Sequence, residues 1–179
     1  MLRSSRFSAN GKISCASCHQ PERYYTDNLA RAKGIAVNQR NTPTVVGASH
    51  LSWFYWDGRR DSLWSQALTP FEVTAEMGSS RTAVVRLVGT DNNYRREYEA
   101  VFGTFPHKLL NSIPSQAGPL GDSDSRKLWL NIAENIRTQI NTVFANIGKA
   151  VAAFERTLQP VDTRFDKYVA ALVNGDDSA

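Results

Sequence analysis

Two cysteines and a histidine occur together in one pentapeptide, Cys15-Ala16-Ser17-Cys18-His19. This is the attachment pattern of c-type haem, in which two thiols add across the haem vinyl groups and the next residue's imidazole takes the iron from one side. In the turn that this pentapeptide forms, both sulfurs reach one edge of the macrocycle while His19 points at its centre. The sequence therefore predicts one covalently bound haem c, with Cys15 and Cys18 as thioethers and His19 as the axial iron ligand.

A Cys-x-x-Cys pair has two other uses. A zinc site needs two further ligands at matching spacing, and the sequence has neither a second Cys pair nor a His-x-His pair. A redox dithiol of the thioredoxin type needs a preceding strand and a parallel sheet around it. Because the motif uses both cysteines of the chain, haem is the favoured interpretation.

Composition narrows the class of protein around this motif. The 179 residues are 41% hydrophobic and 21% charged, which is typical of a globular chain of one or two small domains and excludes disorder. Apolar runs fall short of the roughly 20 residues that a membrane-spanning helix needs. Residues 1–40 hold seven of the 21 basic side chains and two of the 17 acidic ones, so the net charge of +4 comes from this segment. The excess is too scattered for a nucleic-acid groove and suits the two haem propionates.

Helical periodicity dominates the rest of the chain. Apolar residues at steps of three and four predict one long helix over 128–158, with N-caps at 122–125 and a stop at Pro160. Between the shorter helices and this one, residues 103–125 form a long connection rich in Pro, Gly and Ser. No alternating strand pattern occurs, so we expect a mainly α fold. The shorter helices are expected over 62–69, 80–88, 92–102 and 163–173.

Further motifs follow the pentapeptide in order, at 7–19, 40–44, 56–59, 66–67, 76–77 and 152–156. With them the chain resembles the N-terminal half of the bacterial dihaem cytochrome c peroxidases, a superfamily that includes MauG and related tryptophan-modifying enzymes. The likeness runs from about residue 6 to about residue 173. It implies a cytochrome c-like haem domain over 1–125 with long C-terminal helices over 126–179. These helices would bridge to a second haem domain, which we expect to be missing from this chain.

The resemblance also implies roles for single residues. Glu76 matches the family's distal acid/base carboxylate and Gln66 its distal amide, with Pro70 near the same pocket. Trp56 matches a relay of electrons between the two haems, and Asn41 matches a calcium ligand at the interface with the second domain. From the residues alone, Glu76 reads as a solvated side chain near a helix start, and exposure is the alternative for Gln66.

One departure from the family lies between the attachment motif and residue 40. Many members carry a histidine there that blocks the peroxide site until the enzyme is reduced, whereas this chain has Gly34-Ile35. Because isoleucine cannot ligate iron, we predict a ferric haem that is five-coordinate or weakly water-ligated, as in the MauG-like branch. His50 is the alternative ligand, although His50 and His107 are both typical of surface or polar packing.

The function that the resemblance implies is reduction of hydrogen peroxide, or its use to oxidise a protein substrate. Electrons would arrive from a small cytochrome or copper protein. Haem attachment after export implies a periplasmic protein, although no signal peptide is visible in the first residues and the sequence is expected to be incomplete at both ends. A monohaem electron carrier with Met77 as sixth iron ligand is the alternative. A third possibility is that the chain is a fragment that binds haem but catalyses no reaction.

Overall fold

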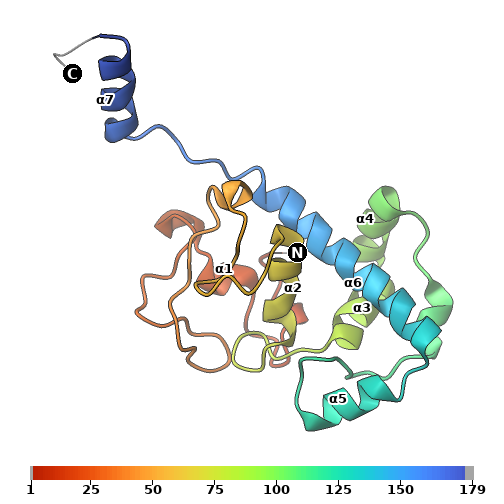
Figure 1. The fold of residues 1–179 in the computed structure, drawn as a ribbon. Helices are drawn as coiled ribbons and strands as arrows, with labels where there is room; N and C mark the ends of the chain where they lie inside the picture. The colour runs from red at the N-terminus through yellow and green to blue at the C-terminus, as the bar shows by residue number, and fades with distance from the viewer. Residues whose placement is uncertain (1, 176–179) are drawn as a thin grey trace.

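The computed structural model describes residues 2–175 (Figure 1). Within this range the chain is helical and has no β-strand, so the predicted mainly α fold is confirmed. None of the helices in this range is long and apolar enough to cross a membrane. The α-helices are α1 (Cys15–Cys18), α2 (Leu63–Glu72), α3 (Arg81–Thr90), α4 (Asn92–Phe102), α5 (Ser123–Leu130), α6 (Glu134–Glu155) and α7 (Arg164–Val173), and the 3₁₀ turns are η1 (Ser5–Phe7), η2 (Pro21–Arg23), η3 (Ala48–His50) and η4 (His107–Asn111).

Side-chain caps explain why three helices begin where the sequence predicts. The oxygens of Ser80, Asp91 and Thr163 each accept main-chain N–H groups from the first turn of α3, α4 and α7. These helices agree with the predicted bounds to within two residues. The helix expected over 62–69 runs on to Glu72 as α2.

The prediction of one helix over 128–158 is wrong, because the chain turns between α5 and α6. Asp122 caps α5 as expected, accepting the Ser125 N–H at 2.8 Å. The extended backbone of Ala133, with ψ of 142°, then separates α5 from α6. The turn buries Trp129 under the Arg81 guanidinium, 5.2 Å from the ring centroid, a position that requires α5 to leave the line of α6.

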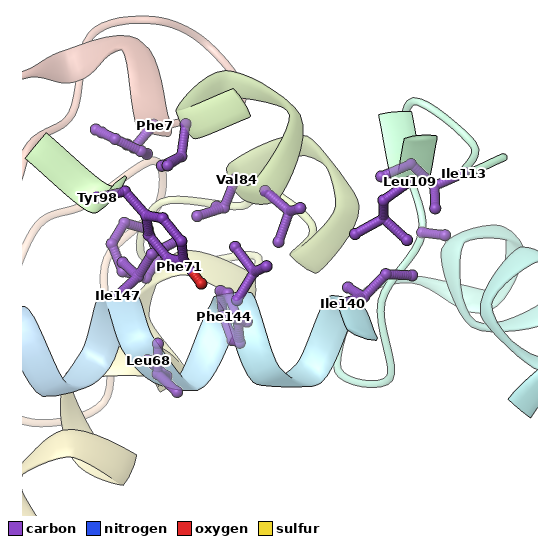
Figure 2. Close-up of a cluster of buried hydrophobic side chains, with 14 of the residues drawn as sticks. Phe7, Leu68, Phe71, Val84, Tyr98, Leu109, Ile113, Ile140, Phe144 and Ile147 are labelled. Atoms are coloured by element: carbon purple, nitrogen blue, oxygen red, sulfur yellow. The ribbon is translucent and has the colours of Figure 1, made fainter. Parts of the chain in front are cut away.

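The core lies where α6 crosses α2 and α3 (Figure 1). Figure 2 shows side chains from several elements converging along α6. The Phe71 ring packs edge-on against both Phe7 and Phe144, with centroids 5.7 and 6.1 Å away. Burying each such side chain stabilises the fold by about 1.5–3 kcal/mol. The labelled core residues are Phe7, Leu68, Phe71, Val84, Tyr98, Leu109, Ile113, Ile140, Phe144 and Ile147.

Close approach of α2 to α6 depends on Gly148. A Cβ at this position would lie 2.6 Å from the main-chain oxygen of Trp64 and 2.8 Å from Cγ of Leu68. No side chain fits in that space, so glycine allows the two helices to touch through their backbones. α6 thereby sets the position of α2.

A smaller buried cluster joins the end of α6 to the start of α2. It consists of Ala48, Phe54, Leu63 and Ala152. The Leu158 carbonyl just beyond α6 accepts the Gly47 N–H at 2.8 Å, which ties the loop before η3 to the same end. Beyond this point the chain leads to α7, which lies apart from the other helices in Figure 1 and buries no residue.

Candidate haem site

The predicted attachment pentapeptide forms α1 and its C-terminal cap. Ser14 and Ser17 form a reciprocal capping box at the start, and the His19 N–H donates to the Cys15 carbonyl at 2.8 Å at the end. Cys15 and Cys18 are both free thiols and half-buried. Because side chains three residues apart share one face of a helix, the two sulfurs lie on the same side of the turn.

The His19 imidazole is positioned through one of its nitrogens. Its Nδ1 lies 3.1 Å from the main-chain oxygen of Tyr25, a contact that makes Nδ1 the protonated donor and leaves Nε2 with its lone pair. Burial lowers the pKa of His19, which favours the neutral ring. Two neighbouring thiols and a neutral imidazole with a free nitrogen are the donor set that a c-type haem requires.

The loop after His19 carries unusual backbone conformations. Tyr24, Tyr25 and Asn28 have φ of 55°, 58° and 56°, in the left-handed region that non-glycine residues seldom adopt. The buried carboxylate of Asp27 holds this loop, since its Oδ2 accepts the Thr42 hydroxyl at 2.8 Å. Such strain persists only where surrounding contacts enforce it, and here it aims the Tyr25 carbonyl at His19.

Both attachment thiols are harder to ionise than an ordinary cysteine. Burial raises the pKa of Cys15 to about 11, and the charge of Glu155 adds to the effect. Burial also raises the pKa of Cys18, with further contributions from the charges of Asp27 and Glu76. The carboxylates of Glu155 and Glu76 therefore lie within electrostatic reach of the two ends of α1.

The Gly34-Ile35 segment lies directly against the turn that carries Glu76. The Ile35 N–H donates to the Glu76 carbonyl at 2.9 Å, and the Ala36 N–H donates to the Ala75 carbonyl at 3.0 Å. A Cβ at Gly34 would lie 2.6 Å from both of those carbonyl oxygens, so only glycine permits this pairing. Lys33 precedes Gly34, and its carbonyl oxygen lies 3.8 Å from the Cys18 Sγ.

Glu76 and Met77 are adjacent in the chain but point to different surroundings. Glu76 is half-buried, and burial raises the pKa of its carboxyl while the charge of Arg59 opposes the rise. Met77 is 4% exposed and belongs to the main hydrophobic core with Phe7 and Phe71. Of the two, Glu76 is the side chain on the side of the attachment turn.

Gln66 lies half-buried in α2, and a proline shapes its surroundings. Pro70 stands four residues later and has no N–H, so it cannot donate to the Gln66 carbonyl as a helix normally would. The Tyr55 hydroxyl donates to that carbonyl instead, at 3.4 Å. The charge of Glu76 acts on the pKa of Tyr55, so this phenol lies near both Gln66 and Glu76. The Arg59 guanidinium stacks over the Tyr55 ring, with its Cζ 3.5 Å from the ring centroid.

Trp56 and Asn41 are in direct contact. The Trp56 indole Nε1 donates to the Asn41 main-chain oxygen at 3.3 Å, and the ring is 62% exposed. The next residue, Asp57, bridges Arg40 at 2.9 Å and Arg59 at 2.7 Å. Among residues 2–175 no group of three or more His, Cys, Asp or Glu side chains is arranged to hold a metal ion. A calcium ion at Asn41 would need most of its ligands from elsewhere.

The two remaining histidines lie on the surface, as the sequence predicts. His50 in η3 has its Nε2 2.8 Å from Gln159 Oε1, near the end of α6. His107 packs against Phe105 and lies 3.5 Å from the Glu99 carboxylate. Both imidazoles are therefore engaged by neighbours outside the attachment turn.

A family comparison decides what this arrangement belongs to. The model of the family described as "Di-haem cytochrome c peroxidase" matches residues 2–174. The chain belongs to the di-haem cytochrome c peroxidase family. The resemblance on which the sequence predictions relied is thereby confirmed.

Individual relatives are similar over nearly the whole chain. The methylamine utilization protein MauG of Methylophilus methylotrophus is 28% identical over 97% of this chain and 41% of its own length. The cytochrome c551 peroxidase of Pseudomonas aeruginosa is 27% identical over 97% of this chain and 40% of its own. A crystal structure of a MauG-like protein associated with microbial copper homeostasis covers 96% of this chain and 42% of its own, with a TM-score of 0.63 and 26% identity. The chain thus spans about two fifths of the length of these di-haem peroxidase relatives.

Three side chains near the site received no role from the sequence, although Arg59 and Glu155 lie within the motifs at 56–59 and 152–156. Tyr55 and Arg59 flank Glu76, and Glu155 faces Cys15 from the last turn of α6. A signal for Glu155 is present in the sequence, because it follows Ile147 and Val151 at steps of four on the apolar stripe. A carboxylate on the apolar face of a helix is unusual and indicates a buried acidic side chain.

Proposed function

We propose that this chain is the peroxide-reacting haem domain of a di-haem peroxidase. It would bind one haem c through Cys15, Cys18 and His19, and use Glu76 and Gln66 on the opposite side of the iron to reduce hydrogen peroxide. The division into a haem domain of residues 1–125 and bridging helices of residues 126–179 is part of this proposal.

The observation that carries the proposal is the pairing of Ile35 and Ala36 with the Glu76 turn beside Cys18. It holds the Glu76 turn close to the haem attachment segment, which supports a position for this carboxylate at the edge of the same haem pocket. By the family resemblance, Ile35 in this pairing occupies the sequence position of the blocking histidine. We therefore expect ferric haem to be five-coordinate or weakly water-ligated without prior reduction.

Glu76 suits the proton transfer that peroxide cleavage demands. Heterolytic cleavage of the O–O bond requires a proton to move from the inner to the outer oxygen. Partial burial raises the pKa of Glu76 and the charge of Arg59 opposes the rise, so this carboxyl takes up a proton more readily than an exposed glutamate. The Gln66 amide would orient peroxide or water beside it. A haem bound through Cys15, Cys18 and His19 would supply the iron at which peroxide reacts.

The remaining assignments concern electron supply. Trp56 would relay electrons towards the second haem, with its indole oriented by the Asn41 carbonyl. Asn41 itself would contribute to a calcium site at the interface with that domain. The electron donor would be a small cytochrome or a copper protein. Alternatively, the enzyme would take electrons from a side chain of a protein substrate, which is thereby oxidised. The proposal includes periplasmic location, since haem attachment in the family follows export.

The electron-carrier alternative is less well supported. It requires the Met77 sulfur to reach the iron, whereas this side chain is 4% exposed among core residues. The same burial is expected if Met77 serves only to anchor the turn that carries Glu76.

The test is an electronic spectrum followed by peroxide kinetics on the haem-loaded chain. We expect a high-spin ferric spectrum that changes on adding hydrogen peroxide. Glu76→Gln should slow that reaction by about 10²- to 10⁴-fold, while the exposed control Glu97→Gln leaves it unchanged. A methionine–iron charge-transfer band at the red end of the spectrum, or equal rates for Glu76→Gln and wild type, would contradict the proposal.

A further inference from the structure

Glu155 is a buried carboxylate that the peroxide mechanism does not use. It stands in the last turn of α6 and is 7% exposed. Within residues 2–175 its Oε2 has no hydrogen-bond partner. Two other buried carboxylates each have a charged or polar partner: the Thr42 hydroxyl donates to Asp27 Oδ2 at 2.8 Å, and Arg81 Nη2 lies 2.8 Å from Glu72 Oε2. Within the same range Glu72 Oε1 also has no partner, but the Arg81 guanidinium balances the charge of that carboxylate. An unpartnered buried carboxylate is costly in its charged form and therefore binds a proton readily.

Glu155 lies next to a small apolar cluster at the end of α6. One turn earlier on α6, Ala152 packs with residues of η3 and α2 in the smaller buried cluster. The carboxylate charge of Glu155 also raises the pKa of the Cys15 thiol in α1, so the two groups are within electrostatic reach of each other. On α6 itself the charged neighbour is Arg156, and on η3 the titratable group is His50, which contacts Gln159.

These surroundings favour the protonated form near neutral pH. Burial raises the pKa of Glu155 to about 7, and the charge of Arg156 opposes the rise. Cys15 is the residue through which one edge of the haem is attached in the proposed function. A change in haem charge would thus act on a carboxyl that is already poised to gain or lose its proton.

We propose that Glu155 is a redox-linked proton-binding site of the haem anchored at Cys15. The proposal rests on the haem attachment proposed above. When an external donor adds one electron to the ferric haem, one proton moves from solvent to the free oxygen of Glu155 and forms an O–H bond. The donor is oxidised by one electron, the haem is reduced by one, and the charge near Cys15 stays constant.

The sign of the effect follows from electrostatics. An added electron near Glu155 disfavours its ionised form, so the pKa of the carboxyl is higher in the reduced protein than in the oxidised protein. The midpoint potential therefore falls as pH rises through the interval between these two pKa values and is flat outside it. Each tenfold change in proton affinity corresponds to about 59 mV for a one-electron couple.

The experiment is a spectroelectrochemical titration of the full haem-loaded chain at a series of pH values around 7. Wild type should show the fall in midpoint potential, and Glu155→Gln should abolish or halve it. Glu134→Gln removes the same charge from the exposed first turn of α6 and should retain the wild-type pH dependence. Equal pH dependence in Glu155→Gln and wild type would overturn the proposal.

A second measurement keeps the test decisive if Glu155→Gln folds poorly. The reduced-minus-oxidised infrared difference spectrum of the wild type should contain a C=O band of a protonated carboxyl that shifts in D₂O. A spectrum without that band overturns the proposal. A pyridine haemochrome assay beforehand separates this outcome from failure of haem attachment, because a chain with no covalent haem contradicts the proposed function instead.

Discussion

The Tyr55 hydroxyl takes the place of the amide hydrogen that Pro70 withholds from the Gln66 carbonyl. A proline inside a helix normally leaves a carbonyl without a donor. Here a side chain from the preceding loop supplies the donor at the residue proposed to face the peroxide. The loop and the helix are therefore linked at the candidate distal site.

Removing this hydroxyl should weaken the link without removing the ring. We expect Tyr55→Phe to lower the free energy of unfolding by about 0.5–1.5 kcal/mol, because a partly buried carbonyl loses its hydrogen bond. Chemical denaturation of the haem-loaded chain measures the loss. The control Tyr168→Phe removes a hydroxyl from the exposed face of α7 and should change nothing. Equal stabilities for the two variants would show that the 3.4 Å contact contributes little.

Gly34 should tolerate no side chain. Gly34→Ala places a methyl group 2.6 Å from the carbonyl oxygens of Ala75 and Glu76, so the pairing must open at a cost of about 1–3 kcal/mol. We expect slower peroxide reaction and an altered ferric spectrum together with the stability loss. Gly89→Ala is a matched control, since its methyl would meet the Phe105 ring at 2.5 Å in the core. It should lose stability and keep the wild-type spectrum.

A histidine at position 35 should introduce the blocking iron ligand that the proposed function expects to be absent. Ile35 is 39% exposed and its N–H is bonded to the Glu76 carbonyl, so an imidazole there starts beside the distal site. We expect Ile35→His to give a low-spin ferric spectrum and a peroxide reaction that requires prior reduction. Val37→His carries the same group two residues further along the loop, on a more exposed side chain, and should remain high-spin. A high-spin spectrum for Ile35→His would contradict the proposed position of the loop.

Stability should depend on pH through Glu155. Its pKa is about 7 in the folded chain against 4.5 for an ordinary glutamate. Below pH 4.5 the carboxyl is neutral in both states; as pH rises from 4.5 to about 7, the unfolded chain loses the proton first, so the free energy of unfolding falls. We expect Glu155→Gln to be more stable than wild type above pH 7, by up to about 3 kcal/mol, and to match it near pH 4. Parallel pH profiles of the two proteins would refute this.

The haem motif and most helices could be predicted from sequence because their signals are local. The cysteine spacing, the cap residues Asp91 and Asp122, and the apolar periodicity each act within a few residues. The prediction of a single helix over 128–158 is wrong because the apolar stripe continues through Ala133, where the backbone turns between α5 and α6. The stripe also misplaces Leu128 and Phe154, which are exposed, whereas Trp129 and Glu155 are buried. Tertiary contacts at each end of α6 decide those orientations.

Within the candidate site, the sequence could name residues but could not show their contacts. Glu76 and Gln66 were assigned through family resemblance, and their roles remain predictions. Their shared neighbour Tyr55 comes from a loop whose left-handed φ of 65° at that residue has no signal in the sequence. The pairing of Gly34 with the Glu76 turn joins segments about forty residues apart, which local patterns do not reveal.

The protonated state of the two attachment thiols has a consequence for the chain before haem is attached. Disulfide formation proceeds through the thiolate, and burial keeps the pKa of both Cys15 and Cys18 above the ordinary value. At neutral pH the newly folded chain should therefore close a Cys15–Cys18 bridge slowly. In an oxidising compartment this delay would keep both thiols reduced until they react with the haem vinyl groups. Burial of the two cysteines would thus favour haem attachment over disulfide formation.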